Sequence, residues 1–330
     1  MYAIFLYTMA NQRGSKDSKG GNNVKKWFVG VDGGGTKTAV LAAQKESSEK
    51  STELTTGCSY RMLGIDDAAK IIAETVESCL QKVEASLTDC AGICVGLPCF
   101  GEDPEQDEAI GQSLKNLLSP APVNIVNDVE VGWAGALAGQ PGIHIVAGTG
   151  SIAFAKNEFG QTARTGGWNE FFGDEGSCYW IGREAMSVFT KEADGRLSKG
   201  ALYEILRREL LLGEDMTFID RITREYAPYR QMVAGFQRYA AQAAQAGDPE
   251  AMALYLRAAQ ELALMAQALK SKLALPEGTK VSYSGGLFRT GDLILEPLKK
   301  EISAFGCVLE APKSSGVEGA WLLAAQNFGK

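Results

Sequence analysis

Residues 27–43 read Trp27-Phe-Val-Gly-Val-Asp-Gly-Gly-Gly-Thr-Lys-Thr-Ala-Val-Leu-Ala-Ala43. Two short apolar runs flank a glycine-rich turn, a pattern that predicts a β-hairpin. Residues 142–156 repeat this plan as Gly142-Ile-His-Ile-Val-Ala-Gly-Thr-Gly-Ser-Ile-Ala-Phe-Ala-Lys156. A unit that recurs in this way indicates a protein made of two related halves. We place the boundary between the halves within residues 129–141.

The remaining segments alternate between helical and strand-like patterns. Apolar residues at helical spacing predict a helix over residues 66–84. Other expected elements are strands at 90–98, 123–126 and 280–284, helices at 108–118 and 317–327, and a largely helical region over 179–275. The sequence therefore predicts an α/β protein.

The composition excludes several classes of protein. The 330 residues are 45% hydrophobic and 22% charged, as in an ordinary soluble globular protein. The net charge of −7 argues against a nucleic-acid partner, since such proteins present a basic face to phosphate. No apolar run approaches the roughly 20 residues that a membrane helix needs, so no membrane association is expected.

The seven cysteines form no CxxC pair. We interpret them as small buried thiols of a reducing, cytoplasmic compartment. A metal cluster built from Cys90, Cys94 and Cys99 is the alternative, although their spacing matches no ferredoxin-type run. His144, the single histidine, is expected to be a packed core residue.

Each glycine turn resembles a nucleotide-binding motif that it does not match. A P-loop needs a lysine directly after its last glycine and a helix behind it. Here Thr36 separates Gly35 from Lys37, and a strand-like run follows. Gly148-Thr-Gly-Ser-Ile-Ala153 has the spacing of a dinucleotide-binding loop, but it also leads into a strand-like run where that fold requires a helix.

Two glycine turns that face each other across a cleft can hold phosphate in a different way. Their bare backbone N–H groups can approach phosphate oxygens closely, because glycine has no Cβ. Asp32 ends the first predicted strand, where it could orient Mg²⁺ through water. The side chains that could add hydrogen bonds or charge are those of Thr36, Lys37, Thr38, Thr149 and Ser151.

Five segments resemble, in order, the motifs of the actin-like ATPase and sugar kinase superfamily. Residues 32–38 and 147–151 resemble its two phosphate motifs, and residues 284–288 its adenosine motif. Two further segments resemble the connecting segments of the superfamily: Asn127-Asp-Val-Glu-Val-Gly-Trp-Ala-Gly-Ala136 and Gly316-Val-Glu-Gly-Ala-Trp321. Within that superfamily, Gly166-Gly-Trp168 and Gly173-Asp-Glu-Gly-Ser177, followed by Tyr179-Trp180, are similar to the N-acetylglucosamine kinases of the BadF/BadG/BcrA/BcrD-type branch.

The resemblance implies two ribonuclease-H-like lobes, each a mixed five-stranded sheet flanked by helices, with ATP and Mg²⁺ in the cleft between them. The last helix of such folds returns to the first lobe, so we assign residues 24–137 and 315–330 to that lobe. Residues 138–314 form the second lobe, with helical insertions. Residues 1–23 are expected to be a disordered leader. Relatives in this branch are often homodimers, and we expect a homodimer here.

The resemblance also implies roles for single residues. The ATP phosphates would contact Gly33, Gly34, Gly35, Thr36, Lys37, Thr38, Gly148, Thr149, Gly150 and Ser151. The adenosine would contact Gly285, Gly286 and Leu287. Asp128 would be the catalytic base that accepts the proton of the attacking sugar hydroxyl, and a turn cap is its alternative. Asp174 and Gly167 would contact the sugar. The alternative for Asp174 is an N-cap with Glu175 as a first-turn acid, and Trp168 is expected to pack within its loop.

Two positions depart from the family pattern. The loop at residues 57–64 has no asparagine, and Ile152 stands where many relatives carry another one. Loss of paired hydrogen-bonding groups should change the sugar preference by a large factor. Ser59, Tyr60 or Arg61 could supply replacements, and a guanidinium near the sugar would disfavour a protonated amine.

The leading prediction is an ATP-dependent kinase that phosphorylates the 6-hydroxyl of an amino sugar such as N-acetylglucosamine or glucosamine. One alternative is an ATPase that activates a dehydratase or reductase partner, which would need cluster cysteines near a dimer interface. A kinase of a different polar substrate is another. A sugar-sensing regulator would need a DNA-binding module, and residues 1–26 are too short for a helix-turn-helix.

Overall fold

The structure is a computed structural model that describes residues 27–329, so the leader expected over residues 1–23 lies outside the described residues. β1 (Trp27–Gly33) and β2 (Lys37–Ala43) form the antiparallel hairpin that the sequence predicts. The strands are short and almost wholly buried, which explains why they appear in the sequence as apolar runs.

The first sheet extends this hairpin on both sides. β3 (Lys50–Thr56) pairs antiparallel with β2, whereas β4 (Cys90–Leu97) runs parallel to β1 and β5 (Val123–Asn127) runs parallel to β4. The strand order is β3-β2-β1-β4-β5. Asp32 lies opposite Gly96, and Leu97 lies opposite Asn127, so three parallel strands end at one edge.

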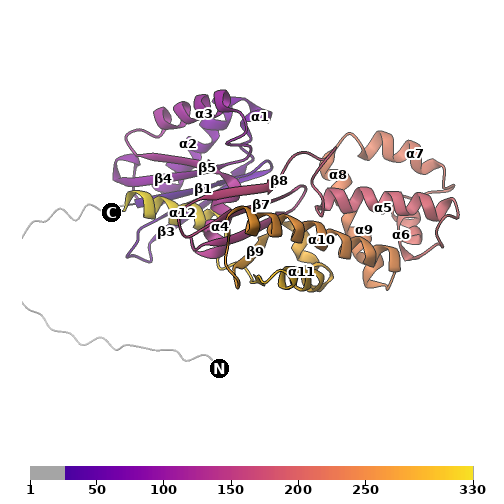
Figure 1. The fold of residues 1–330 in the computed structure, drawn as a ribbon. Helices are drawn as coiled ribbons and strands as arrows, with labels where there is room; N and C mark the ends of the chain where they lie inside the picture. Colours follow the sequence, from indigo (N-terminus) through magenta and orange to yellow (C-terminus); the bar gives the residue numbers. More distant parts are fainter. Residues whose placement is uncertain (1–26, 330) are drawn as a thin grey trace, which may run out of the picture.

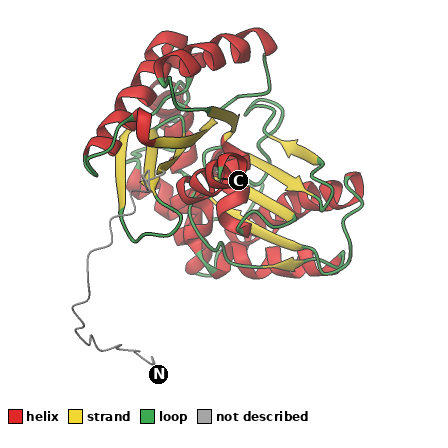
Figure 2. Cartoon of the chain, turned by 90° about the vertical axis from the view of Figure 1, so that its left-hand side faces the viewer, coloured by secondary structure: helices red, strands yellow, loops and turns green. Residues whose placement is uncertain are grey.

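The second sheet repeats the same plan. β6 (Gly142–Ala147), β7 (Ser151–Lys156) and β8 (Thr162–Gly166) are antiparallel neighbours. β9 (Lys280–Ser284) runs parallel to β6, and β10 (Val308–Leu309) runs parallel to β9. The order is β10-β9-β6-β7-β8. The expectation of two mixed five-stranded sheets flanked by helices is confirmed (Figure 2).

Three helices accompany the first sheet. α2 (Ile65–Gln81) packs on β2 and β3, and α3 (Pro104–Leu117) packs on α2 and β5. The short α1 (Tyr60–Leu63) precedes α2. A single 3₁₀ turn (Leu87–Asp89) leads into β4. We call the first sheet with these helices the first lobe.

Two helices lie between the sheets. α4 (Asp128–Leu137) contacts strands of both sheets, and α12 (Gly316–Phe328) packs on α4, β1 and β4 (Figure 1). Gly316 and Gly319 permit a close approach of this helix to its neighbours. A Cβ on Gly319 would lie 2.1 Å from a backbone oxygen of α4. This contact allows one apolar cluster to join both sheets.

The helical region predicted over residues 179–275 is confirmed, with breaks between its helices. In Figure 1 most of these helices gather on one side, away from the sheets. The region contains α5 (Cys178–Ala193), α6 (Ala201–Glu209), α7 (Thr217–Arg221), a π-helical turn (Ile222–Tyr226), α8 (Arg230–Gly235), α9 (Gln237–Gln245) and α10 (Pro249–Lys272). After β9 follow a 3₁₀ turn (Gly286–Thr290) and α11 (Asp292–Ala304). We call the second sheet with these helices the second lobe.

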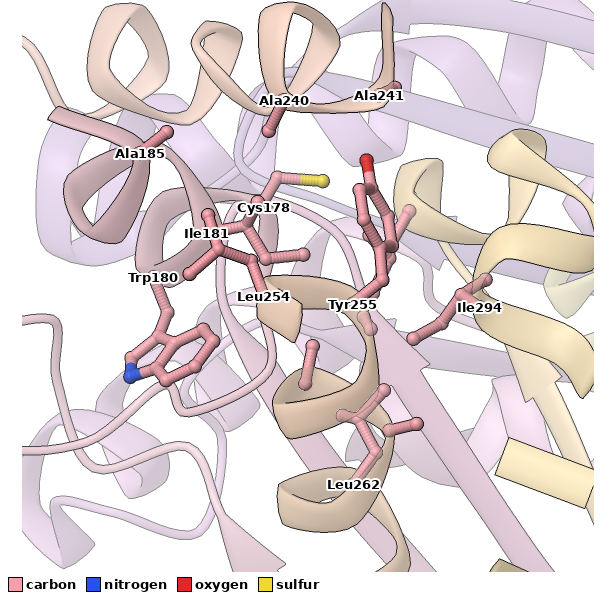
Figure 3. Packing of buried hydrophobic residues seen from close by; sticks show 14 of the residues in the cluster. Cys178, Trp180, Ile181, Ala185, Ala240, Ala241, Leu254, Tyr255, Leu262 and Ile294 are labelled. Carbon is pink, nitrogen blue, oxygen red and sulfur yellow. The ribbon is translucent and has the colours of Figure 1, made fainter. Parts of the chain in front are cut away.

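The core of the second lobe fixes the start of α5. Cys178 and Ile181 of α5 are packed with Leu254 and Tyr255 of α10 and with alanines of α9 (Figure 3). Small residues on α9 allow the three helices to approach closely, and burial of this apolar surface stabilises their arrangement. The N-terminus of α5 is thereby placed next to the turn between β6 and β7.

Several elements were not expected from the sequence. β3 and β8 are edge strands rich in polar residues, so no apolar run marks them. α1 lies in the stretch interpreted as a loop, and α11 lies where no element was expected. None of the helices within residues 27–329 is both long and apolar enough to cross a membrane.

Candidate active site

A cleft of about 510 Å³ is lined by residues of both lobes and of α4. The sequence assigned nine of the lining residues to a site: Gly35, Arg61, Asp128, Gly148, Thr149, Gly150, Ser151, Gly167 and Asp174. The tertiary structure therefore brings together the two glycine turns, the expected base and part of the expected sugar site.

The first glycine turn joins β1 to β2. The Gly34 N–H donates to the Lys37 carbonyl at 3.0 Å, which closes the turn and leaves Gly35 and Thr36 at its tip. The backbone N–H groups of these two residues have no hydrogen-bond partner among the described residues. A Cβ on Gly35 would meet no atom within 4 Å, so the tip is open to a ligand.

The second glycine turn joins β6 to β7. The Gly148 N–H donates to the Gly150 carbonyl at 2.9 Å, whereas the N–H groups of Thr149 and Gly150 have no partner within residues 27–329. The N–H groups of Cys178 and Tyr179, in the first turn of α5, donate to the carbonyls of Gly148 and Thr149 at 2.9 and 3.3 Å. The helix thus holds the turn from behind and leaves two amides free.

Asp128 lines the cleft as the first residue of α4. Asn127 caps this helix: its Oδ1 accepts the Val129 N–H at 3.1 Å, and its Nδ2 donates to the Phe100 carbonyl at 2.7 Å. Because Asn127 caps the helix, the alternative reading of Asp128 as a turn cap loses its support. Burial, and then the nearby Asp32 carboxylate, raise the pKa of Asp128 from 3.8 to about 7.

Asp32 lies behind the first turn and does not line the cleft. A Cβ on Gly316 would lie 2.5 Å from its Oδ2, so the carboxylate sits against the start of α12. Burial raises the pKa of Asp32 to about 6, while the positive charge of Lys37 acts to lower it. A bound cation would stabilise a buried carboxylate of this kind.

Asp174 lies in the loop between β8 and α5, and its side chain is 3% exposed. Its Oδ1 accepts the Ser151 N–H at 3.1 Å, and its Oδ2 pairs with Arg230. α5 begins at Cys178 with Ser177 as its cap, so the alternative that Asp174 is an N-cap is wrong. Its φ of +57° is a conformation that residues other than glycine rarely adopt.

Of the three residues expected to replace the missing asparagine, only Arg61 lines the cleft. It forms an ion pair with Glu102 at 3.3 Å. Tyr60 is 2% exposed, and its hydroxyl donates to Asp107 at 2.7 Å, because α1 turns the ring into the core of the first lobe. Ser59 is also buried. The structure therefore does not bring Ser59 or Tyr60 to the cleft.

Three other expectations need correction. Thr38 is fully buried in β2, so its hydroxyl does not face the cleft. Leu287 is fully buried in the core of the second lobe, so its side chain does not face a ligand either. Trp168 is 73% exposed, as are its neighbours Phe171 and Phe172 at 80% and 73%, because this loop turns its aromatic side chains outward. Trp168 therefore does not pack within its loop.

The expected adenosine segment adjoins the second turn. Gly285 has φ +114°, and a Cβ there would lie 2.2 Å from the Ala147 carbonyl oxygen. Only glycine fits between the ends of β9 and β6 at this point. The Gly286 nitrogen lies 3.8 Å from the position of a Cβ on Gly148. The segment is thus placed next to the turn, although it does not line the cleft.

The thiols and the imidazole lie as expected from the sequence, with one exception. Six of the seven cysteines are buried and Cys99 is half-buried at the cleft. Burial raises the pKa of the Cys90 and Cys94 thiols to about 12, so these thiols resist forming the thiolate that binds metal. His144 is fully buried, with its Nε2 2.9 Å from Ser284 Oγ.

The residues present fit a magnesium nucleotide. Four free backbone amides in the two turns offer donors to phosphate oxygens. Lys37 lies at the first turn and interacts with Asp32, the carboxylate that would balance a cation. Mg²⁺ takes such carboxylates through water and binds mainly to the phosphates.

Among the residues of the cleft that sequence reasoning did not assign to a site are Asn127, Glu102 and Arg230. Asn127 carried a signal, since asparagine directly before a helical run is a preferred N-cap. Glu102 and Arg230 carried none. Arg230 lies 56 residues after Asp174 in a helical region with many exposed arginines, so only folding brings the two together.

Two curated relatives share most of the chain's length. An N-acetyl-D-glucosamine kinase from Dictyostelium discoideum is 30% identical over 293 residues, 84% of this chain and 90% of that protein. An N-acetylmuramic acid/N-acetylglucosamine kinase from Clostridium acetobutylicum is 28% identical over 277 residues, 83% of this chain and 90% of that protein. Both relatives are sugar kinases, which transfer phosphate to an alcohol group.

The fold is also shared with solved structures. A candidate N-acetylglucosamine kinase from Chromobacterium violaceum superposes with a TM-score of 0.70 at 26% identity, over 91% of this chain and 99% of that chain. The family model for the BadF/BadG/BcrA/BcrD ATPases matches residues 29–324, from β1 into α12. With both lobes and the cleft between them inside that match, this protein belongs to the BadF/BadG/BcrA/BcrD ATPase family.

Proposed function

We propose that this protein is an ATP-dependent kinase of an N-acetylated amino sugar, with N-acetylglucosamine as the first candidate and its 6-hydroxyl as the acceptor. The observation that carries the proposal is Asp128, which lies in one cleft with two glycine turns whose amides are free. The names of the two curated relatives support the class of substrate.

The two turns and Asp32 would hold the nucleotide. ATP with Mg²⁺ supplies the phosphoryl group that is transferred. The free N–H groups of Gly35, Thr36, Thr149 and Gly150 would donate to its phosphate oxygens, and Asp32 would hold the metal through water. Phosphoryl transfer depends mainly on positioning and on charge stabilisation, which preorganised amides provide.

Asp128 would orient the acceptor hydroxyl and take its proton. Its pKa, raised to about 7, makes the Asp128 carboxylate a stronger base than an ordinary aspartate. A base of this strength is well matched to proton transfer near neutral pH. Asn127 keeps Asp128 in place, because its side chain fixes the first turn of α4.

The sugar would lie against Asp174, Gly167 and Arg61. A carboxylate accepts hydrogen bonds from sugar hydroxyls, and Arg61 can donate to a hydroxyl or an acetyl oxygen. Both arginines of the cleft are paired with carboxylates, so the charges of the lining do not by themselves choose between a protonated amine and a neutral acetamido group. We place N-acetylglucosamine ahead of glucosamine because the names of both curated relatives include it.

The test is ADP release with Mg-ATP in the presence of N-acetylglucosamine, N-acetylmuramic acid, glucosamine, N-acetylmannosamine, glucose or no sugar. We expect release that depends on N-acetylglucosamine and that is lost in Asp128→Asn. Phosphorus NMR of the product then identifies the phosphorylated hydroxyl. Release that is equal with and without every sugar would reject the kinase and favour an ATPase that acts on a protein partner.

A further inference from the structure

The proposed sugar-binding carboxylate has a charged partner from a distant part of the chain. Arg230 is the first residue of α8, and its side chain is 38% exposed and lines the cleft. Its Nη2 pairs with Oδ2 of Asp174, and its Nε lies 3.4 Å from Oε2 of Glu170. The guanidinium is therefore held between two carboxylates of the loop that follows β8.

The same guanidinium lies directly over the second glycine turn. A Cβ on Gly150 would be 2.5 Å from Nη2 of Arg230 and 2.8 Å from Oδ1 of Asp174. The neighbouring Ser151 N–H donates to that Oδ1 at 3.1 Å. The turn, the carboxylate and the guanidinium thus form one contiguous unit, and the absence of a side chain at Gly150 makes the unit possible.

Asp174 needs such support for two reasons. Its backbone has φ +57°, which costs free energy in a residue other than glycine and persists only where the surroundings fix it. Its side chain is 3% exposed, and a buried carboxylate without a cation and hydrogen bonds is strongly disfavoured. Arg230 is the cation that Asp174 contacts among the described residues.

We propose that Arg230 is a positioning residue of the sugar site, which holds the Asp174 carboxylate against the second glycine turn so that sugar and phosphate are bound in a fixed relation. This inference rests on the proposed kinase function for its meaning. The arginine acts through Asp174, so its effect should appear in sugar binding first.

The charges around Asp174 predict how its titration changes without the arginine. Burial acts to raise the pKa of Asp174, whereas the Ser151 N–H and Arg230 act to lower it, and Glu170 acts to raise it. Arg230→Met removes the guanidinium and leaves burial and Glu170 to raise the pKa further. Less of the carboxylate is then ionised near neutral pH, so the sugar KM should fall as pH rises.

The experiment compares the whole protein with Arg230→Met, Arg230→Lys and the control Arg257→Met. Arg257 pairs with Glu184 on another part of the second lobe and does not line the cleft. At pH 7 we expect the N-acetylglucosamine KM of Arg230→Met to rise about tenfold or more, as for loss of a charged hydrogen bond. It should fall towards pH 9 as the carboxylate ionises and stay above the wild-type value, because the positioning contact is still missing. Arg230→Lys should be intermediate, and the control should stay within about twofold.

A double-mutant cycle separates positioning from a direct contact with the nucleotide. In an Asp174→Asn background, Arg230→Met should change the sugar KM by less than about twofold, because the residue through which it acts is gone. An equal change in both backgrounds, or a raised KM for ATP with an unchanged KM for sugar, would overturn the proposal.

A measurement without substrate keeps the inference distinct from the proposed function. Carbon-13 NMR of the aspartate carboxyl groups, assigned with Asp174→Asn, follows the titration of Asp174 directly. The midpoint of the Asp174 titration should shift to higher pH in Arg230→Met. An unchanged midpoint would reject the role of Arg230. If it moves but no sugar supports ADP release by the wild type, the kinase function fails while the Arg230–Asp174 linkage stands.

Discussion

The two glycine turns are built alike, but their surroundings differ. Both close a hairpin, and each leaves two backbone amides free. Behind the first turn lies Gly57, where a Cβ would be 2.3 Å from the Gly35 carbonyl oxygen. Behind the second lies the N-terminus of α5, and the Asp174–Arg230 pair lies over its Gly150 in the cleft. The first turn therefore packs on backbone and has the buried Asp32 behind it, whereas the second is in contact with an ion pair of two side chains.

This difference indicates how function is divided between the halves. Both halves contain the hairpin with a glycine turn, and in both the turn has free amides. Phosphate binding would therefore depend on the feature that the two halves share. The loop and helices after β8 occur in the second half, and they supply Asp174, Glu170 and Arg230. The Asp174 part of the proposed sugar site would then depend on what was added to one half, while Arg61 comes from the other.

The largest effect should come from Asp128, which lies in the same cleft as both turns. Asp128→Asn should lower kcat by about 100-fold to 10,000-fold, the range for loss of a general base. The melting temperature should not fall, because the change removes a buried carboxylate whose raised pKa shows that ionisation is unfavourable there. Coupled ADP assays and thermal denaturation measure both, and a kcat within tenfold of wild type would contradict the assignment.

A direct comparison of the turns uses Gly150→Ala and Gly35→Ala. A new Cβ at Gly150 would push on Arg230 and Asp174, whereas one at Gly35 meets no atom within 4 Å. We expect Gly150→Ala to raise the KM for sugar and for ATP about tenfold or more, and Gly35→Ala to raise only the KM for ATP, about threefold or less. Steady-state kinetics against both substrates decide this. Equal effects of the two substitutions would remove the difference between the turns.

The pH profile follows from the Asp128 carboxyl group. Its pKa is about 7, and the base must be ionised, so kcat/KM should fall about tenfold per pH unit below 7 and level off above it. Gly35→Ala should keep the same midpoint, since the first turn contributes no carboxylate to the cleft. A profile that stays flat down to pH 5 would show that Asp128 is ionised there, contrary to the effect of its burial.

The smallest effect is expected where the lobes meet across the cleft. Glu102 of the first lobe pairs with Arg164 of β8 at 2.9 Å and with Arg61 at 3.3 Å. These side chains are 23% to 38% exposed, so water screens the pairs. Glu102→Gln should lower the free energy of unfolding by less than about 1 kcal/mol in urea titrations. Glu53→Gln, which breaks a pair within the first lobe, is the matched control.

Much of the fold could be predicted because its signals are local. The hairpins, α2 and β4 are apolar segments with clear spacing and turns, and the structure has them where the sequence predicts them. The edge strands β3 and β8 could not be predicted in the same way. Their pairing depends on a neighbour in the sheet, and their polar residues face solvent.

In the candidate site, too, the sequence predicted what depends on local signals and missed what depends on the tertiary structure. Tyr60 was expected to contact the sugar because its stretch was interpreted as a loop. Instead, α1 directs its ring into the core, and Asp107 accepts a hydrogen bond from its hydroxyl. Thr38 follows a glycine turn in sequence, yet the alternation of a strand turns it away from the cleft. The helix or strand in which a residue lies decides whether its side chain points into the cleft or into the core. The order of residues in the sequence did not predict that direction for Tyr60 and Thr38.

By itself, the sequence determined the two glycine turns, the alternation of strands and helices and the order of the family's motifs, because each depends on residues close together in the chain. Only the tertiary structure decided that Asp128 shares a cleft with both turns and that Arg230 reaches Asp174. The last contact joins residues 56 positions apart, and it forms because the packing of α5, α9 and α10 carries α8 back to the second turn.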